Sequence, residues 1–158
     1  MKLYEKWILK GFVMFIGTVI ALLSAFWLPE VAELTAVNNP EFAYLRYPVL
    51  VMMIVTTIPF YIALIKTNRL LNLIQKKEAF TEASVKALKV ISYCGAAIAS
   101  SYFCLAVGLV MVKAVQPGFF IAIIMLIVTS TTISFFANLL KILLEEALSY
   151  KHEVDLTV

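Results

Sequence analysis

Polar side chains recur along the last long apolar stretch of this 158-residue chain. Thr131, Ser134, Asn138 and Lys141 follow i, i+3, i+7, i+10 spacing, which places them on one face of a helix. Such an intramembrane polar face can line a path for an ion or a small solute. It can also hold neighbouring helices together through hydrogen bonds, with the lysine reaching toward the membrane surface. No carboxylate accompanies the face inside the apolar stretch, and cation-coupled transport usually needs one, so the sequence favours the packing interpretation.

The sequence offers no candidate residues for catalysis, metal binding or cofactor binding. His152 is the single histidine, and no residue near it could orient it or share a metal. Cys94 and Cys104 lack the spacing of a zinc site and stand in an apolar run, as small packing residues do. Glycine-rich phosphate loops, nucleophile elbows and metal-binding helix motifs are absent. We predict a protein that is not an enzyme, needs no cofactor and does not bind nucleic acid directly.

The composition indicates a membrane protein. Hydrophobic residues make up 63% of the chain, against roughly half in a soluble domain. A soluble fold of this size could not bury so much apolar surface, whereas a lipid bilayer removes the need to do so. We predict one membrane domain over residues 1–158, which crosses the cytoplasmic membrane of a bacterium several times.

Four apolar runs are long enough to cross a hydrocarbon layer of roughly 30 Å as helices. They cover residues 7–28, 47–65, 90–112 and 119–144. We therefore predict an all-α fold, a polytopic membrane four-helix bundle. In the third run, small residues repeat four apart from Gly95 onward, which predicts close packing against another helix.

Pro59 lies well inside the second run and should kink its helix, because it removes a backbone hydrogen bond. We expect the neighbouring hydroxyls of Thr56 and Thr57 to satisfy the backbone groups that the proline leaves unpaired.

A polar stretch at residues 66–89 separates the second and third runs. The apolar side of the second helix continues into it through Leu70, Leu71, Leu73 and Ile74. The turn should fall at residues 77–79. Thr81 is then suited to cap the next helix, with Phe80 packing on Val85. We expect a long helical cytoplasmic hairpin between helices 2 and 3.

Basic residues are distributed unevenly between the segments that flank the four runs. Of the 13 lysines and arginines, Arg46 and Lys113 alone lie in the connections at 29–46 and 113–118. The others lie within the first ten residues, in the 66–89 hairpin, or from residue 141 onward, near and after the end of the fourth run. Because basic segments stay on the cytoplasmic side, we predict that both termini and the hairpin are cytoplasmic.

Two short patterns resemble those of a known family. The third helix begins Phe80-Thr81-Glu82, and the chain ends Glu153-Val154-Asp155-Leu156-Thr157-Val158. Together they resemble an uncharacterised family, a domain of unknown function, of small four-span bacterial membrane proteins. That family usually has a proline and an asparagine where this chain has Ala79 and Val154.

Members of the family are typically encoded beside a very small helix-turn-helix DNA-binding protein of the Xre/Cro type. The resemblance implies a membrane protein that holds or releases a transcription regulator. It marks six residues as candidates for binding this partner: Phe80, Thr81, Glu82, Asp155, Leu156 and Thr157. Helix capping alone would also explain the first three, and a frayed C-terminal tail at residues 149–158 would explain the others.

The leading function is therefore a non-enzymatic membrane protein that regulates, or interacts with, a small cytoplasmic transcription regulator. The alternative is a small transport or permeation subunit, working as a homo-oligomer, that uses the face of Thr131, Ser134 and Asn138. A third interpretation is an envelope-stress component that works through lipid contact, in which the basic residues of the hairpin bind anionic lipid headgroups.

Overall fold

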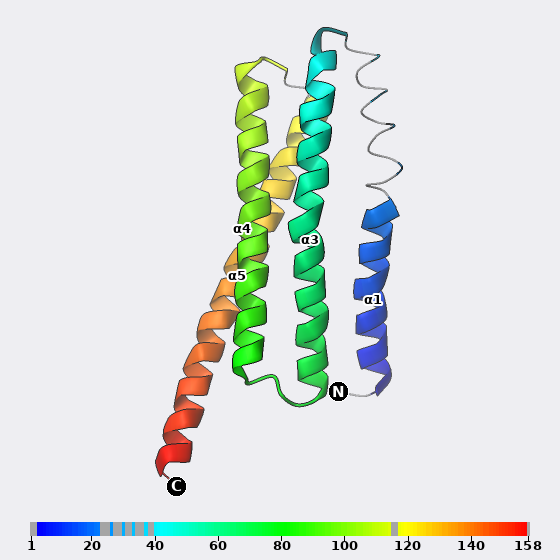
Figure 1. Cartoon of the computed structure of the whole chain (residues 1–158). Helices are drawn as coiled ribbons and strands as arrows, with labels where there is room; N and C mark the ends of the chain where they lie inside the picture. The colour runs from blue at the N-terminus through cyan, green and yellow to red at the C-terminus, as the bar shows by residue number, and fades with distance from the viewer. Residues whose placement is uncertain are drawn as a thin grey trace.

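The computed structural model describes residues 3–22, 26, 30, 33, 37, 40–114 and 117–157, and most of these residues are helical (Figure 1). The helices are α1 (Leu3–Leu22), the 3-10 helix η2 (Pro40–Leu45), α3 (Arg46–Gln75), α4 (Glu82–Met111) and α5 (Pro117–Thr157). The predicted all-α class is confirmed, since the described residues include no strand.

Three helical segments are long and apolar enough to cross a membrane: Ala43–Gln75, Glu82–Met111 and Pro117–Thr157. They contain the predicted second and fourth runs, and the third run except for its last residue, Val112, and they extend beyond the expected starts of all three. The first predicted run, residues 7–28, coincides with α1 as far as Leu22. Apart from Phe26, the rest of that run lies outside the described residues, as does part of the 29–46 connection.

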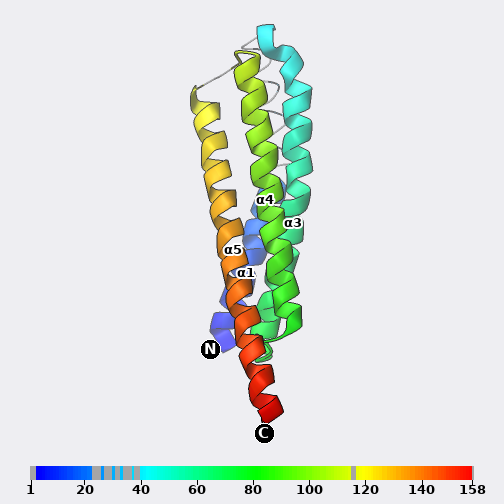
Figure 2. The same ribbon diagram turned by 90° about the vertical axis from the view of Figure 1, so that its left-hand side faces the viewer.

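The long helices pack in chain order, with α1 on α3, α3 on α4 and α4 on α5 (Figure 1). The start of α1, the α3–α4 turn and the end of α5 lie at one end of the molecule, and the α4–α5 turn lies at the other (Figures 1 and 2). A buried apolar cluster occupies the seam between α4 and α5: Tyr102, Ala106, Leu109 and Ile123. The last turns of α5 extend past the other helices (Figure 2).

The turn between α3 and α4 lies where the sequence places it and is closed by backbone hydrogen bonds. Lys77 adopts a left-handed conformation with φ 59°, and its N–H donates to the Ile74 carbonyl at 3.1 Å. The N–H of Glu78 donates to the Leu73 carbonyl at 2.9 Å. This pair of bonds is a Schellman motif. The same motif ends α4, where the left-handed residue is Lys113 with φ 57°.

Thr81 is the N-cap residue of α4, with extended backbone angles φ −137° and ψ 160°, but its side chain makes no capping hydrogen bond. Its hydroxyl instead donates backwards to the Glu78 carbonyl at 2.9 Å. The expected side-chain cap is therefore wrong, because the N–H of Ser84, from which the hydroxyl oxygen would accept, donates to the Thr81 backbone carbonyl instead, at 3.1 Å.

The expectation for the threonines near Pro59 is also wrong. α3 runs through Pro59 as one helix, and the carbonyl that loses its partner there is that of Val55, four residues earlier. Thr56 and Thr57 both donate instead to the Met53 carbonyl, at 2.9 and 3.0 Å. A hydroxyl bonds the carbonyl three or four residues before it, and Val55 is too close in sequence to either threonine.

The backbones of α4 and α5 approach each other closely at Gly95. A Cβ atom there would stand 3.0 Å from the Ser130 carbonyl oxygen and 3.2 Å from the Ser134 nitrogen. One turn away, the Ser134 hydroxyl donates to the Ser92 carbonyl at 2.8 Å, and the Ser92 hydroxyl donates to the Ser134 carbonyl at 3.1 Å. The small-residue repeat predicted a close helix contact, and at Gly95 the partner is α5.

α1 is fastened to α3 by a tyrosine and a glycine. The Tyr61 hydroxyl donates to the Gly17 carbonyl at 3.0 Å. Gly17 is buried, and a Cβ atom there would lie 3.2 Å from Cδ1 of Leu64. α1 can therefore lie against α3 because a residue without a side chain occupies the contact.

Replacing Gly95 by valine is expected to lower the free energy of unfolding by about 1–3 kcal/mol, because the added atoms push α5 away from α4. Gly108→Val is the matched control, since nothing lies within 4 Å of a Cβ atom at Gly108. Thermal unfolding of both variants in detergent micelles, followed by circular dichroism, measures the difference. Equal destabilisation of the two variants would contradict the close contact.

Candidate functional site

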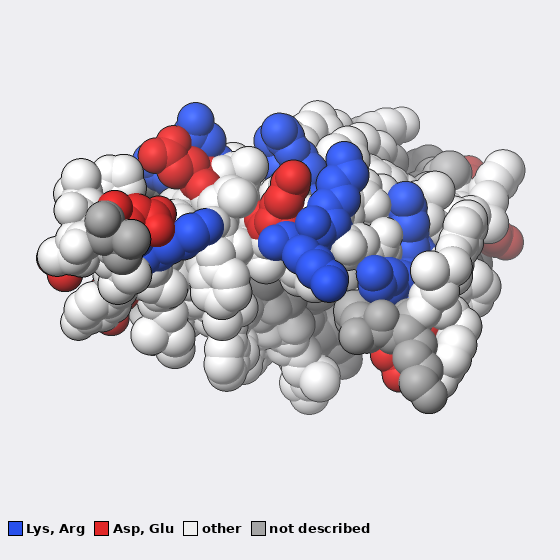
Figure 3. Space-filling view, turned by 90° about the horizontal axis from the view of Figure 1, so that it is seen from below, with Lys and Arg blue, Asp and Glu red and all other residues white. Residues whose placement is uncertain are grey.

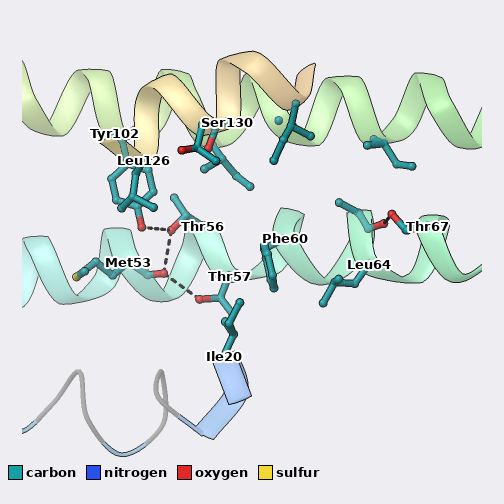
Figure 4. Close-up of a pocket in the computed structure, with 16 residues that line it drawn as sticks. Ile20, Met53, Thr56, Thr57, Phe60, Leu64, Thr67, Tyr102, Leu126 and Ser130 are labelled. Atoms are coloured by element: carbon teal, nitrogen blue, oxygen red, sulfur yellow. Dashed lines mark hydrogen bonds between the residues drawn. The ribbon is translucent and has the colours of Figure 1, made fainter. Parts of the chain in front are cut away.

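A cavity of about 400 Å³ lies among α1, α3, α4 and α5 (Figure 4). Its walls are apolar side chains interrupted by hydroxyl groups, which belong to Thr56, Thr57, Thr67, Tyr102, Thr129 and Ser130. No charged side chain is among the described residues that line it. α1 contributes Ile20 to the wall, and the three longer helices contribute the rest of the described lining.

The helical repeat explains why these residues share one space. α4 lines the cavity with Ile91, Gly95, Ile98 and Tyr102, which are three or four residues apart and so stand on one face of the helix. α5 contributes residues 126, 129, 130 and 133, which likewise lie on one side of that helix. The cavity is therefore the space between facing stripes of the bundle, and the hydroxyls are the polar positions within those stripes.

A buried chain of hydrogen bonds crosses the cavity wall between α4 and α3 (Figure 4). The hydroxyl oxygens of Tyr102 and Thr56 are 3.1 Å apart, and Thr56 donates to the Met53 carbonyl at 2.9 Å. Since the single hydroxyl proton of Thr56 goes to Met53, Tyr102 is the donor to Thr56. Tyr102 is 8% exposed and Thr56 is 5% exposed. The pair therefore joins two helices through side chains that are both buried.

The chemistry that this cavity supports is binding rather than proton transfer. It offers apolar surface and neutral hydroxyls, a combination that suits an apolar molecule with a few hydrogen-bonding groups. Within the described part of the chain, no group of three or more His, Cys, Asp or Glu residues is placed to hold a metal ion.

The three residues of the predicted intramembrane polar face have different surroundings along α5, and none of them lines the cavity. Ser134 lies in the seam between α4 and α5, where it bonds to Ser92. Thr131 is half-buried and Asn138 is exposed. Lys141 pairs with Glu145 at 3.9 Å where the helix nears its charged end. For Ser134 the geometry supports the packing interpretation.

Sequence reasoning missed the cavity. Its hydroxyls come from three helices, and along the chain they look like isolated polar positions in apolar runs. The available signal was the pair of threonines at 56 and 57 together with Tyr102, since a tyrosine hydroxyl inside an apolar run needs a partner. Which helix carried that partner depended on the packing order, which periodicity alone does not specify.

The six candidate partner-binding residues all lie at the end of the molecule formed by the α3–α4 turn and the C-terminus (Figure 1). At the turn, Phe80 is 59% exposed, Glu82 is exposed and Thr81 is half-buried. Asp155, Leu156 and Thr157 are exposed.

The C-terminal tail at residues 149–158 is not frayed where it is described, because α5 continues as a helix to Thr157. The Thr157 hydroxyl donates to the Glu153 carbonyl at 2.7 Å within that helix. Val158 lies outside the described residues. The sequence contains no proline or glycine after Gly118 that would stop the helix.

Comparison with known proteins places the chain in a family. Residues 30–158 match the model described as "Protein of unknown function (DUF2975)". The chain belongs to the DUF2975 family. It is 40% identical over 155 residues to "Uncharacterized membrane protein YoaS" of Bacillus subtilis (strain 168), a match that covers 95% of each chain. No solved structure matches. The resemblance to an uncharacterised membrane protein family is thus confirmed, while the neighbouring DNA-binding protein stays a prediction.

Replacing Tyr102 by phenylalanine removes one hydroxyl and should cost about 0.5–1.5 kcal/mol of unfolding free energy. Thr56→Val removes the acceptor with little change of shape. In a double-mutant cycle the two changes should couple, with the second hydroxyl loss costing less once the first is made. Unfolding in micelles measures each corner of the cycle. Additive losses would show that the two hydroxyls act independently.

Proposed function

We propose that this member of the DUF2975 family is a four-span protein of the bacterial cytoplasmic membrane with both termini in the cytoplasm. Three described helices have the length and apolarity to span, and α1 packs alongside α3 as a fourth. Consecutive long helices run in alternating directions (Figure 1). Basic side chains gather at the end that holds the termini and the α3–α4 turn (Figure 3), as expected of a cytoplasmic face.

Reporter fusions test this orientation. A protein active only in the cytoplasm, such as green fluorescent protein, should be functional when fused after Glu78 or after Val158 and silent after Lys113. Alkaline phosphatase, active only outside, should give the opposite pattern. Phosphatase activity from a fusion after Glu78 would overturn the proposed orientation.

We further propose that the protein acts without catalysis, by holding a cytoplasmic protein partner at this end. The observation that carries the proposal is the exposed helical end of α5. Tyr150 is 69% exposed, Val154 is 60% and Leu156 is 79%, although the segment stays helical to Thr157. A short helix without packing is only marginally stable in water, and exposed apolar side chains on it favour contact with another protein.

For the partner we propose a small helix-turn-helix DNA-binding protein. The end of α5 carries carboxylates at Glu145, Glu146, Glu153 and Asp155 against the lysines Lys141 and Lys151. DNA-binding domains present basic surfaces to phosphate, so an acidic helix can occupy the same surface. Binding at the membrane would then compete with binding to DNA. The resemblance of the C-terminal pattern to the family that neighbours such regulators supports the same partner.

Removal of residues 150–158 is expected to lower the amount of regulator that co-purifies with the membrane protein by about tenfold or more, as loss of an interface centre does. A Val154→Ser, Leu156→Ser variant should act in the same direction without shortening the chain. The matched control is Ser134→Ala with Asn138→Ala, which leaves the cytoplasmic end intact. The measurement is quantitative co-purification from native membranes of a host that carries both genes.

One observation favours the alternative, a small transport or permeation subunit that works as a homo-oligomer. Asn138 presents an amide on the exposed surface of α5, and a second copy packed there would satisfy it. Solute movement that depends on Ser134 and Asn138 but survives removal of residues 150–158 would favour this function over partner binding.

A further inference from the structure

A second cavity, of about 380 Å³, lies where α1 begins and α3 ends. Its described lining consists of Leu3, Lys6, Trp7, Lys10, Gln75 and Lys76. Three of these side chains are lysines, they come from both sides of the helix seam, and none of the lining residues is acidic. The cavity is separate from the hydroxyl-lined one and lies at the end of the molecule where basic side chains gather (Figure 3).

The lysines of this cavity are only weakly engaged by the protein. Lys6 Nζ donates to the Gln75 carbonyl at 3.4 Å, and Lys10 Nζ donates to Asn72 Oδ1 at 3.3 Å. Both distances are long for a hydrogen bond, and both acceptors are neutral. Each ammonium group has three N–H donors, so both keep donors for a ligand.

No carboxylate neutralises these lysines within the described residues. The ion pair found there is Lys141–Glu145, on α5. Ammonium groups that converge on one concave surface repel each other, and a bound anion would reverse that repulsion. The bond from Lys6 to the Gln75 carbonyl occupies one of the last carbonyls of α3, whose negative end would otherwise disfavour an anion.

The surroundings of the lysines indicate that the anion carries apolar chains. Trp7 is 73% exposed and Leu3 is 75% exposed, and tryptophan is typical of the boundary between headgroups and hydrocarbon. The same face of α1 continues one turn further through Gly11, which has open space around its Cβ position, and Met14, which is 61% exposed. This gives an apolar track along α1, away from the lysines.

We propose that the seam between α1 and α3 binds an anionic phospholipid, with the headgroup phosphate held by Lys6, Lys10 and Lys76. The glycerol lies against Trp7 and the acyl chains follow α1 past Gly11 and Met14. The site goes beyond the proposed function, because it needs neither the partner nor the end of α5. The proposed site also differs from a general attraction of lipid to the basic hairpin. Only these three lysines line the cavity, whereas the other basic residues nearby lie outside its described lining.

Fluorescence of Trp7 tests the proposal in the full-length chain. The chain has two tryptophans, so Trp27→Phe leaves Trp7 as the single reporter. The protein is placed in vesicles of phosphatidylcholine and phosphatidylglycerol in which one lipid at a time carries brominated chains, at equal mole fraction. Brominated phosphatidylglycerol should quench Trp7 more strongly than brominated phosphatidylcholine. If the two brominated lipids quenched Trp7 equally in the protein that carries only Trp27→Phe, the proposal would be overturned.

Lysine variants show whether the cavity causes the preference. Lys6→Gln with Lys10→Gln and Lys76→Gln should reduce the preference for phosphatidylglycerol about tenfold or more. The matched control, Lys86→Gln with Lys89→Gln and Lys151→Gln, removes the same charge from exposed lysines outside the cavity and should keep the preference. If the two variants lost the preference for phosphatidylglycerol equally, general surface charge would explain that preference, and the proposed site would be overturned.

Two further measurements separate the remaining explanations. Replacing the three cavity lysines by arginine keeps their positive charge, so the preference for phosphatidylglycerol should remain. A purely structural role of these lysines in holding α1 against α3 would not require the preference to remain. Circular dichroism checks that each variant is folded.

Inorganic phosphate or glycerol phosphate at millimolar concentration should not displace the lipid, because neither engages the apolar track. Complete displacement by either would identify a site for free phosphate and overturn the lipid assignment.

Discussion

The close approach of α4 and α5 at Gly95 is the contact on which the rest of the bundle depends. In a bilayer, apolar side chains gain little by exchanging lipid for protein, so helices associate through close packing and hydrogen bonds. The contact supplies both, because the missing side chain brings the backbones together and Ser92 and Ser134 then exchange hydrogen bonds. With α5 held on one side of α4, α3 packs on another, and the hydroxyl-lined cavity is the space left between them.

The other two seams repeat this arrangement with different residues. Tyr102 and Thr56 join α4 to α3, and Tyr61 joins α3 to the Gly17 carbonyl of α1. Each seam thus carries a hydroxyl hydrogen bond among apolar side chains, where an unpaired polar group is costly. We infer that these hydrogen bonds determine which helices become neighbours. Apolar side chains alone would pack against many different surfaces. The α1–α3 seam ends among lysines rather than hydroxyls, and it is there that a charged ligand fits.

Much of the fold follows from the sequence, because long apolar runs and turn residues determine helices locally. The runs around 47–65, 90–112 and 119–144, the turn at 77–79 and a close contact at Gly95 could all be predicted. The length of α5 could not, because polarity after Ala147 looks like a tail although nothing there breaks a helix. The hydrogen bonds of the Thr81 and Thr56 hydroxyls depended on how the backbone groups nearby were paired. Both cavities required knowledge of which helices are neighbours, and that information lies in pairs of residues far apart in the chain.

Lysine occupies the left-handed position that ends α3 and the one that ends α4. Glycine would suit those positions better by about 1–2 kcal/mol, but Lys77 and Lys113 each carry an ammonium group there. Lys113 stands just beyond the last residue of α4, and Lys89 is the last charged residue before the apolar part of that helix. In the proposed four-span arrangement, the stretch between Lys89 and Lys113 is about 35 Å long, close to the roughly 30 Å of hydrocarbon. Sliding α4 along the membrane normal would then draw one of these charges into hydrocarbon, so a thinner or thicker bilayer would be met by tilting of the bundle.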